Sequence, residues 1–448
     1  MNTKDKNEEK GNVLFISLGC PKNQVDSEIM IAHLIMNGYG ISNDPEDADF
    51  AIVNTCGFIQ EAIDESLAEM KNLVEFRENF PESGLKKIIM VGCLVERLGI
   101  KNLDKILPGI DCFVDVNSPE KIVQALESGK REFHSKDLYL MTAETPRIIM
   151  NYPHIAYLKI SEGCSNQCTF CTIPAIRGKY RSRTSESILK EFGNLQKLGV
   201  SEVILISQDS SYYGKDLTSG IDLSSLLKKI DRENKTGIWV RVMYLHPDRI
   251  DNELIDTVLK ADTILPYFDL PLQHTSDKIL RLMGRKRKMD ELQKFMEKIS
   301  TSNKKTVIRN TFIVGFPGET EKEFNELLEF VTASNAGRIG LFRYSDELGT
   351  PAYMLEGKNS TEEIDDRFNQ LAESAEKKML RFNSSLINKT LPVIIDGIEK
   401  DEYFCRTQFD APEIDIPGYL ETKKKLEEGN IINAKLTSAD SMQFNFRF

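Results

Sequence analysis

Six of the eight cysteines form two groups of three, and these groups are the residues best suited to chemistry. The first group, here called the loop cysteines, lies in the segment SEGCSNQCTFCTIP with the spacing Cys-x3-Cys-x2-Cys: Cys164, Cys168 and Cys171. Three thiolates at these separations can bind one face of a cuboidal iron–sulfur cluster, whereas a cluster held entirely by protein uses four cysteines. The missing ligand leaves one iron open for a small molecule. The alternative is a zinc site, but structural zinc takes four N or S ligands and no nearby Cys or His supplies a convincing fourth.

The second group, here called the sheet cysteines, consists of Cys20, Cys56 and Cys93. Each lies at or just beyond the carboxyl end of a predicted parallel strand, which is where ligands bind in open α/β sheets. We therefore expect the three thiols to meet at one point and to hold a second metallocentre with an open iron. The alternative is three buried core cysteines, because free cysteine is among the most buried residue types. The remaining cysteines, Cys112 and Cys405, are predicted to be structural, since one starts a strand and the other lies inside one.

Alternating strand-like and helix-like segments predict an α/β fold for a first domain, residues 12–135. Its short β-branched runs, bounded by turn residues, predict buried parallel strands at 13–18, 50–55 and 87–92. Helical patterns are present between these strands, at 24–37 and 59–79. This βαβ series predicts an open parallel sheet, which would bring the sheet cysteines to one edge. The irregular stretch 128–153 marks the domain boundary.

A second domain, residues 150–385, repeats the alternation of strand and helix six times. Its strands are predicted at 155–160, 202–207, 238–244, 264–270, 306–314 and 338–345. Six β/α units are too few for the usual eight-stranded barrel, so a partial, open (β/α)6 barrel is expected. Short strands punctuated by Gly and Pro then predict a small antiparallel β-barrel over 386–448.

Composition limits the classes of protein that remain. The 448 residues include 58 Lys and Arg against 69 Asp and Glu, a net charge of −11, and 40% are hydrophobic. The apolar content argues against wholesale disorder, and the acidity argues against nucleic-acid binding by bulk electrostatics. No apolar run approaches the length of a membrane span, and the N-terminus MNTKDKNEEKGN is a polar tail without a signal region. A cytoplasmic location with reduced thiols is the expectation.

The CxxxCxxC loop after the first barrel strand resembles that of radical S-adenosylmethionine (SAM) enzymes. The order of a three-Cys domain, this barrel and a small terminal β-barrel is similar to the methylthiotransferases over residues 12–448. The resemblance implies SAM and two [4Fe–4S] clusters as cofactors, with the six grouped cysteines as ligands, and a terminal barrel of the TRAM type. It also implies that the sheet-cysteine cluster carries the sulfur to be inserted, and that an external low-potential donor supplies electrons.

Four segments resemble the RimO-type branch of this family, which modifies the β-carbon of an aspartate in protein twelve of the small ribosomal subunit. They are SLGCPKNQVDSE (17–28), SQDSSYYG (207–214), LPLQHTS (270–276) and RTQFDAPEID (406–415). The tRNA-modifying MiaB-type branch is the alternative enzyme, and a non-catalytic iron–sulfur redox protein is the alternative outside enzymes. Residues 391–448 hold 7 Lys and Arg against 11 Asp and Glu, which favours a basic ribosomal-protein partner and makes direct nucleic-acid binding secondary.

Further residues are candidates for contact with the cofactor. Phe170, inside the CTFC turn, is expected near the adenine or in loop packing. Gln208 and Asp209 end the second barrel strand, where they could reach cofactor or substrate or only cap the loop. Gly315 belongs to the turn in TFIVGFPGET, which resembles a cofactor-contacting glycine-rich turn but could be only a helix entry. The basic run at 285–288 could grip an rRNA-associated substrate or an acidic electron donor, but a solvated helix end is the expectation. The sequence identifies no catalytic acid or base.

Overall fold

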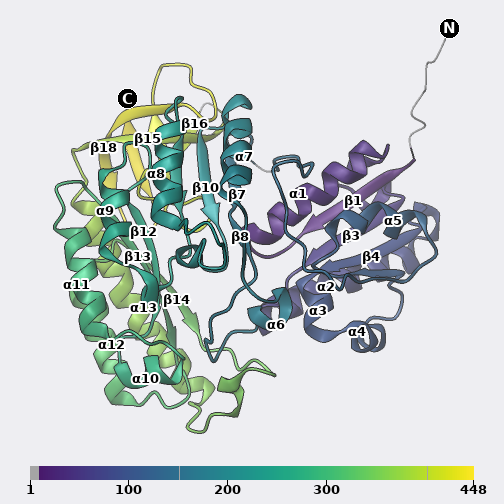
Figure 1. Ribbon diagram of the computed structural model, residues 1–448, viewed down its shortest axis with the longest axis horizontal. Coiled ribbons are helices and arrows are strands. Elements are labelled where there is room, and N and C mark those ends of the chain that lie inside the picture. Colours follow the sequence, from purple (N-terminus) through teal and green to yellow (C-terminus); the bar gives the residue numbers. More distant parts are fainter. Residues whose placement is uncertain (1–9, 151, 401) are drawn as a thin grey trace. The chain divides into compact units, whose positions relative to one another are not determined.

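The computed structural model describes residues 10–150, 152–400 and 402–448 (Figure 1). The first nine residues of the predicted polar N-terminal tail lie outside the described residues. The chain packs into two units. The first contains Met1–Asn151, Glu162–Asn166 and Cys171–Arg181, and the second contains Tyr152–Ser161, Gln167–Phe170 and Ser182–Phe448. No helix in the described part of the chain combines the length and the apolar character that crossing a bilayer requires.

The first unit is built on a parallel sheet of six strands in the order β2-β1-β3-β4-β5-β6. The strands are β1 (Asn12–Ser17), β2 (Gly40–Ser42), β3 (Phe50–Thr55), β4 (Lys87–Gly92), β5 (Cys112–Val114) and β6 (Glu132–Phe133). The helices are α1 (Pro21–Met36), α2 (Gln60–Asn79), α3 (Cys93–Leu98), α4 (Ile100–Ile106) and α5 (Ile122–Glu127). The predicted open α/β sheet is confirmed, including the bounds of β3 and β4.

Both faces of this sheet are covered by helices, which explains why its central strands contain runs of four or more consecutive hydrophobic residues (Figure 1). Ala51 and Val53 of β3 pack on the side of α2, α3 and α4, whereas Ile52 between them packs on the side of α1 and α5. The edge strands β2 and β6 have only three and two residues, too few for a sequence pattern to reveal them. The strand order reverses at β1, so the crevice between β1 and β3 is the expected ligand site of such a sheet.

The second unit contains six parallel strands, as predicted for a partial barrel. They are β7 (Ile155–Lys159), β10 (Glu202–Ile206), β11 (Trp239–Val242), β12 (Tyr267–Gln273), β13 (Val307–Val314) and β14 (Arg338–Arg343). Two three-stranded sheets, β11-β10-β7 and β12-β13-β14, are connected by a parallel bridge between Val240 and Ile264. The helices that alternate with them are α7 (Ser185–Lys197), α8 (Leu223–Glu233), α9 (Asn252–Lys260), α10 (Asp277–Leu282), α11 (Met289–Ser300), α12 (Glu321–Ala333) and α13 (Thr361–Ser384).

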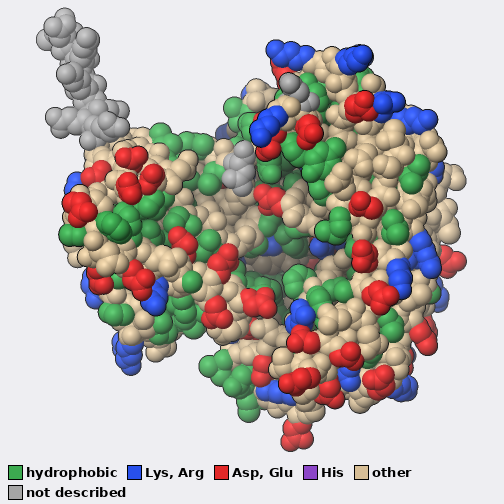
Figure 2. Space-filling model, turned by 180° about the vertical axis from the view of Figure 1, so that it is seen from behind, with side chains coloured by type: hydrophobic (Ala, Val, Ile, Leu, Met, Phe, Trp, Pro, Cys, Tyr) green, Lys and Arg blue, Asp and Glu red, His purple; other side chains and the backbone are tan. Residues whose placement is uncertain are grey.

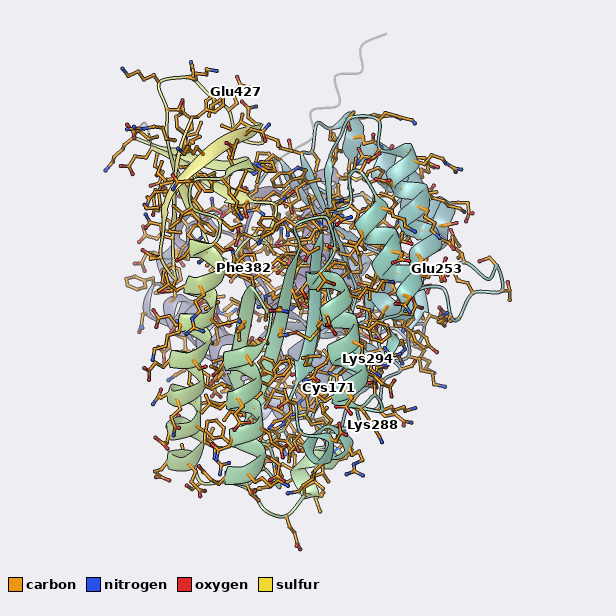
Figure 3. All side chains as sticks on the ribbon, turned by 90° about the vertical axis from the view of Figure 1, so that its left-hand side faces the viewer. Cys171, Glu253, Lys288, Lys294, Phe382 and Glu427 are labelled. Carbon is orange, nitrogen blue, oxygen red and sulfur yellow. The ribbon has the colours of Figure 1, made fainter. Side chains whose placement is uncertain are left out.

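A closed five-stranded barrel ends the chain, in the order β15-β16-β17-β19-β18. Its strands are β15 (Thr390–Glu399), β16 (Glu402–Thr407), β17 (Gly418–Glu421), β18 (Ile431–Ala439) and β19 (Phe444–Arg447). The predicted small barrel is confirmed. The pair β17–β19 is parallel, while the other four pairs are antiparallel. Figure 3 shows this barrel next to the end of α13 that carries Phe382, with Glu427 on an outer loop.

Residues 406–415, here called the clamp segment, attach this barrel to the amino ends of the parallel strands. Arg406 donates from Nη2 to Oε2 of Glu202, the first residue of β10, at 2.8 Å. Asp410 accepts a hydrogen bond of 2.7 Å from Nε of Arg338, the first residue of β14. All four side chains are buried. The clamp segment therefore occupies the ends of the strands opposite to those where ligands of such barrels bind.

Candidate metal centres and cofactor site

The three sheet cysteines come together at the carboxyl edge of the first unit's sheet. Cys20 follows β1 as the N-cap of α1, Cys56 follows β3, and Cys93 begins α3 directly after β4. These strands are neighbours in the sheet, and each of the three thiols interacts electrostatically with the other two. Gly19 shows how close the loops are: it has φ +92°, and a Cβ added to it would lie 3.1 Å from Sγ of Cys56. The three cysteines thus lie at neighbouring strand ends on one edge of the sheet, and metal binding there stays a prediction.

Two polar side chains hold the loops that carry these thiols. Asn23 donates from Nδ2 to the carbonyl oxygens of Leu18 and Thr55, both at 3.1 Å, which ties the loop after β1 to the end of β3. The Cys93 thiol donates to Oδ1 of the same Asn23 at 3.5 Å. Ser66 of α2 accepts from the backbone N–H of Cys56 and donates to its carbonyl, both at 3.0 Å. The three sulfurs are thus positioned by the fold itself.

The charge environment differs among the three thiols. Burial raises the pKa of Cys93 to about 11 and also raises the pKa of Cys56. Burial opposes ionisation of Cys20 as well, but Lys22, Arg177 and the backbone N–H groups at the start of α1 outweigh it and lower its pKa. Iron binds thiolates, so a metal at this point would have to displace protons from the two more basic thiols.

The loop cysteines are distributed over both units. In the first unit, the backbone N–H of Cys164 donates to the carbonyl of Gly178 at 3.0 Å, and the N–H of Asn166 donates to Sγ of Cys164 at 3.5 Å. Cys171 is half-buried in the same unit. In the second unit, Sγ of Cys168 lies 3.9 Å from Nε2 of His246. The role of these three cysteines as cluster ligands stays a prediction.

The glycine-rich turn after β13 is held in one conformation by its neighbours in the second unit. Gly315 has φ +80°, and a Cβ added to it would lie 2.3 Å from Cγ1 of Ile364, so only glycine fits there. The backbone N–H of Gly315 donates to Oε2 of Glu319 at 3.0 Å. Thr320 and Glu323 form a capping box that starts α12, so the turn is a helix entry as well.

A buried charge network beneath this turn was missed from the sequence. Glu319 is fully buried, and its Oε1 accepts from Nη1 of Arg367 at 2.9 Å. Its Oε2 lies 3.3 Å from Nε2 of His274, which is also fully buried. LPLQHTS drew attention to His274 only as a mark of one family branch. No local pattern relates positions 274, 319 and 367, because the barrel brings them together from three different elements.

Phe170 and Gln208 are two other candidates for contact with the cofactor. The ring of Phe170 packs edge-on against Phe316 at 6.4 Å between centroids, so loop packing is present and contact with adenine stays a prediction. Gln208 lies just after β10, half-buried, at the carboxyl end where ligands of such barrels bind. Its contact with the cofactor also stays a prediction.

The expectation of a solvated basic run at 285–288 is wrong for Arg285. Arg285 is buried, with Nη1 2.6 Å from Nε2 of His246. The backbone N–H groups of Lys286 and Arg287 donate to the carboxylate of Asp248 at 2.9 and 3.0 Å. The segment is drawn inward because these donors and the guanidinium find partners on the loop after β11, which the local sequence does not reveal.

Three family models match this chain. Residues 12–137 match the family described as Uncharacterized protein family UPF0004, residues 158–331 match the Radical SAM superfamily, and residues 387–445 match the TRAM domain. Among solved structures, TsrM from Kitasatospora setae, a radical SAM methyltransferase, has a TM-score of 0.53 at 14% identity over 76% of this chain and 75% of that one. OxsB, a cobalamin-dependent radical enzyme, has a TM-score of 0.54 at 13% identity over 82% of this chain and 56% of its own. These two likenesses show the fold alone.

Curated relatives are much more similar in sequence. The ribosomal protein uS12 methylthiotransferase RimO of Carboxydothermus hydrogenoformans is 42% identical over 95% of this chain and 97% of its own. The protein of the same name from a Thermoanaerobacter species is 40% identical over 96% of this chain and 98% of its own. These matches favour the ribosomal-protein branch over the tRNA branch and over a non-catalytic redox protein. With its radical SAM barrel and its converging sheet cysteines, the chain belongs to the RimO family of radical SAM methylthiotransferases.

Proposed function

We propose that this protein inserts a methylthio group at the β-carbon of an aspartate in ribosomal protein uS12. The observation that carries the proposal is the convergence of Cys20, Cys56 and Cys93 at one sheet edge, in a chain that also contains the CxxxCxxC loop. A radical SAM enzyme that only abstracts hydrogen needs one cluster, whereas sulfur insertion needs a second site to carry sulfur. The identity with RimO relatives along almost the whole chain supports the substrate.

The chain uses SAM and two [4Fe–4S] clusters, as its family does. We assign the loop cysteines to the cluster that binds SAM and the sheet cysteines to the cluster that carries sulfur. The donor sets fit these groups, because three thiolates leave one iron of each cluster without a protein ligand. When bound, SAM and the clusters supply the radical that removes the β-hydrogen and the methylated sulfur that replaces it. An external low-potential donor supplies the electrons.

The chain's own residues bind and orient these groups and need not act as acids or bases. The turn at Gly315, fixed by the buried Glu319, offers backbone to the cofactor at the carboxyl edge of the barrel strands. Phe170 and Gln208 are the other proposed cofactor contacts. Asn23 and Ser66 keep the sheet cysteines in place. Burial of Cys56 and Cys93 would limit the access of water to a cluster held by these thiolates.

A basic protein partner in the cytoplasm remains our proposal, but the charge argument for it becomes weaker. Asp396, Asp410 and Asp415 of the terminal barrel are engaged inside the protein, the first two with Arg406 and Arg338 and the third with the hydroxyl of Tyr267. They contribute little to the surface, so the outside of this barrel is less acidic than its composition suggests. On the face shown in Figure 2, acidic and basic side chains are interspersed.

The intact mass of uS12 from cells with and without this gene tests the proposal. A methylthio increment present only with the gene, and lost when Cys20, Cys56 and Cys93 are replaced by Ala, is the expected result. A matched variant with Cys112→Ala and Cys405→Ala, two buried cysteines of strands, should keep the increment. If uS12 is unmodified in both strains while methylthiolated adenosine disappears from tRNA in the deletion strain, the chain belongs to the other substrate class.

A further inference from the structure

Arg177 is a buried arginine next to the sheet cysteines, and nothing in its local sequence explains it. It ends α6 (Ile173–Arg177), and its side chain is only 3% exposed. In the first unit, Nη2 lies 3.0 Å from Oδ2 of Asp26, and Nη1 lies 3.1 Å from Oε2 of Glu162. Nη2 also donates to Oδ1 of Asn23 at 2.6 Å. A buried guanidinium is costly unless it is paired, and these three partners hold its plane in one orientation.

A fourth contact of the guanidinium is with a sheet cysteine. Nη2 of Arg177 donates to Sγ of Cys93 at 3.4 Å. The positive charge also acts on Cys20 and Cys56, whose thiolate forms it favours against the effect of burial. Nη2 has two N–H groups for three acceptors, Asn23, Asp26 and the sulfur, so the hydrogen bond to the sulfur is a shared one, and Glu162 holds the other side of the guanidinium. The arrangement is a charged hydrogen-bond donor presented to the sulfur of a proposed cluster ligand.

Hydrogen bonds to cluster sulfurs and nearby positive charge stabilise the reduced, more negative state of an iron–sulfur cluster and raise its reduction potential. We infer that Arg177 is a positioning residue that acts through Cys93 and raises the reduction potential of the sheet-cysteine cluster. The inference rests on the proposed function, because it assumes that the sheet cysteines bind that cluster. It adds the control of electron transfer at the site, which the cysteines alone do not explain.

A simple structural ion pair is the competing explanation. Arg177 with Asp26 and Glu162 would then stabilise the first unit and leave the cluster's potential unchanged. The two explanations predict different midpoint potentials for a normally formed cluster. A change in protein stability alone does not alter that potential.

The test uses the full chain with Cys164, Cys168 and Cys171 replaced by Ala, so that only the sheet-cysteine cluster can form. After anaerobic reconstitution, iron is counted and the midpoint potential is measured by a redox titration followed by electron paramagnetic resonance. Arg177→Gln removes the charge, and Arg177→Lys keeps the charge but loses the planar fork. The matched control is Arg183→Lys, because Arg183 is an equally buried arginine that pairs with Glu191 in the second unit.

The expected result is unchanged iron in both Arg177 variants, with potentials more negative than the parent and the larger shift in Arg177→Gln. Arg183→Lys should leave the potential where it is. An unchanged potential in Arg177→Gln with full iron would overturn the inference. Loss of iron in both Arg177 variants would also overturn it, because Arg177 would then hold the site together rather than tune it. Absence of iron from the parent itself would instead contradict the proposed function.

Discussion

At the scale of single residues, the sites depend on side chains and glycines whose surroundings admit no substitute. Asn23 contacts the ends of two strands and the Cys93 thiol at once, so its amide is fully used. Gly315 combines a left-handed backbone with a neighbour, Ile364, that fills the space of any side chain. The fold alone constrains both positions, and a bound cofactor or cluster would constrain them further.

Replacing Gly315 by Ala should damage the cofactor site beyond the ordinary cost of its backbone. An alanine in the left-handed region costs about 1–2 kcal/mol, and at Gly315 its Cβ also meets Ile364. Gly199→Ala is the matched control, because Gly199 has φ +79° with no atom within 4 Å of the added Cβ. We expect a modest fall of the melting temperature for Gly199→Ala. Gly315→Ala should show a larger fall and roughly tenfold weaker SAM binding by calorimetry, equivalent to about 1.4 kcal/mol.

Equal melting temperatures for the two alanine variants, together with unchanged SAM affinity, would show that Ile364 moves aside and that the turn does not contact the cofactor.

At the scale of elements, the two ends of the parallel strands have different roles. The carboxyl ends of β1, β3 and β4 carry the sheet cysteines, and the carboxyl end of β13 carries the glycine-rich turn. The amino ends of β10 and β14 bind the clamp segment through Glu202 and Arg338. RTQFDAPEID, which marks one branch of the family, therefore includes residues that attach the terminal barrel. Its resemblance to RimO sequences need not reflect substrate contact.

Breaking the clamp should destabilise the second unit strongly. Arg338 and Asp410 are both at most 1% exposed, so Arg338→Met leaves a buried carboxylate unpaired, at a cost of about 3–5 kcal/mol. Arg447→Met removes an exposed pair with Glu421, and we expect less than about 1 kcal/mol. Differential scanning calorimetry of the full chain measures both.

A double variant, Arg338→Met with Asp410→Leu, should recover part of the lost stability, because neither charge is then left buried alone. If Arg338→Met costs no more than Arg447→Met, the terminal barrel is held by its other contacts and the clamp segment is not needed.

At the scale of the whole molecule, three family models follow one another along the chain, and two groups of three cysteines are the proposed ligands. The chain has a net charge of −11, but acidic and basic side chains are interspersed on the face shown in Figure 2. Specificity for the proposed basic protein partner therefore has to come from local complementarity rather than from the overall field.

Iron content tests the division of the cysteines across the molecule. The reconstituted chain should bind about eight irons, from two clusters of four. Replacing either the loop cysteines or the sheet cysteines by Ala should leave about four, and the control variant with Cys112→Ala and Cys405→Ala should leave about eight. Elemental analysis of the purified chain measures this. About four irons in the parent chain, unchanged after loss of the sheet cysteines, would remove the second cluster from the proposal, and about eight irons after that loss would remove the sheet cysteines as its ligands.

The sequence by itself determined most of the secondary structure and both cysteine groups. Short β-branched runs such as 50–55 and 87–92 became strands with those bounds, because their hydrophobicity is a local property that burial on both faces requires. The spacing of the loop cysteines is likewise a local property, because all three lie within eight consecutive residues. Even the meeting of the sheet cysteines followed from a general rule about strand ends in parallel sheets.

Only the tertiary structure decided which distant side chains support those sites. Arg177 lies 84 residues from Cys93 and 154 from Asn23, and Arg406 lies 204 residues from Glu202. Contacts at such separations arise when the topology brings different strands and loops together, and no local periodicity records them. The contacts of the buried Glu319 with His274 and Arg367 could not be predicted from the sequence for the same reason. Local patterns determine elements, whereas charge pairing in the interior depends on how those elements are assembled.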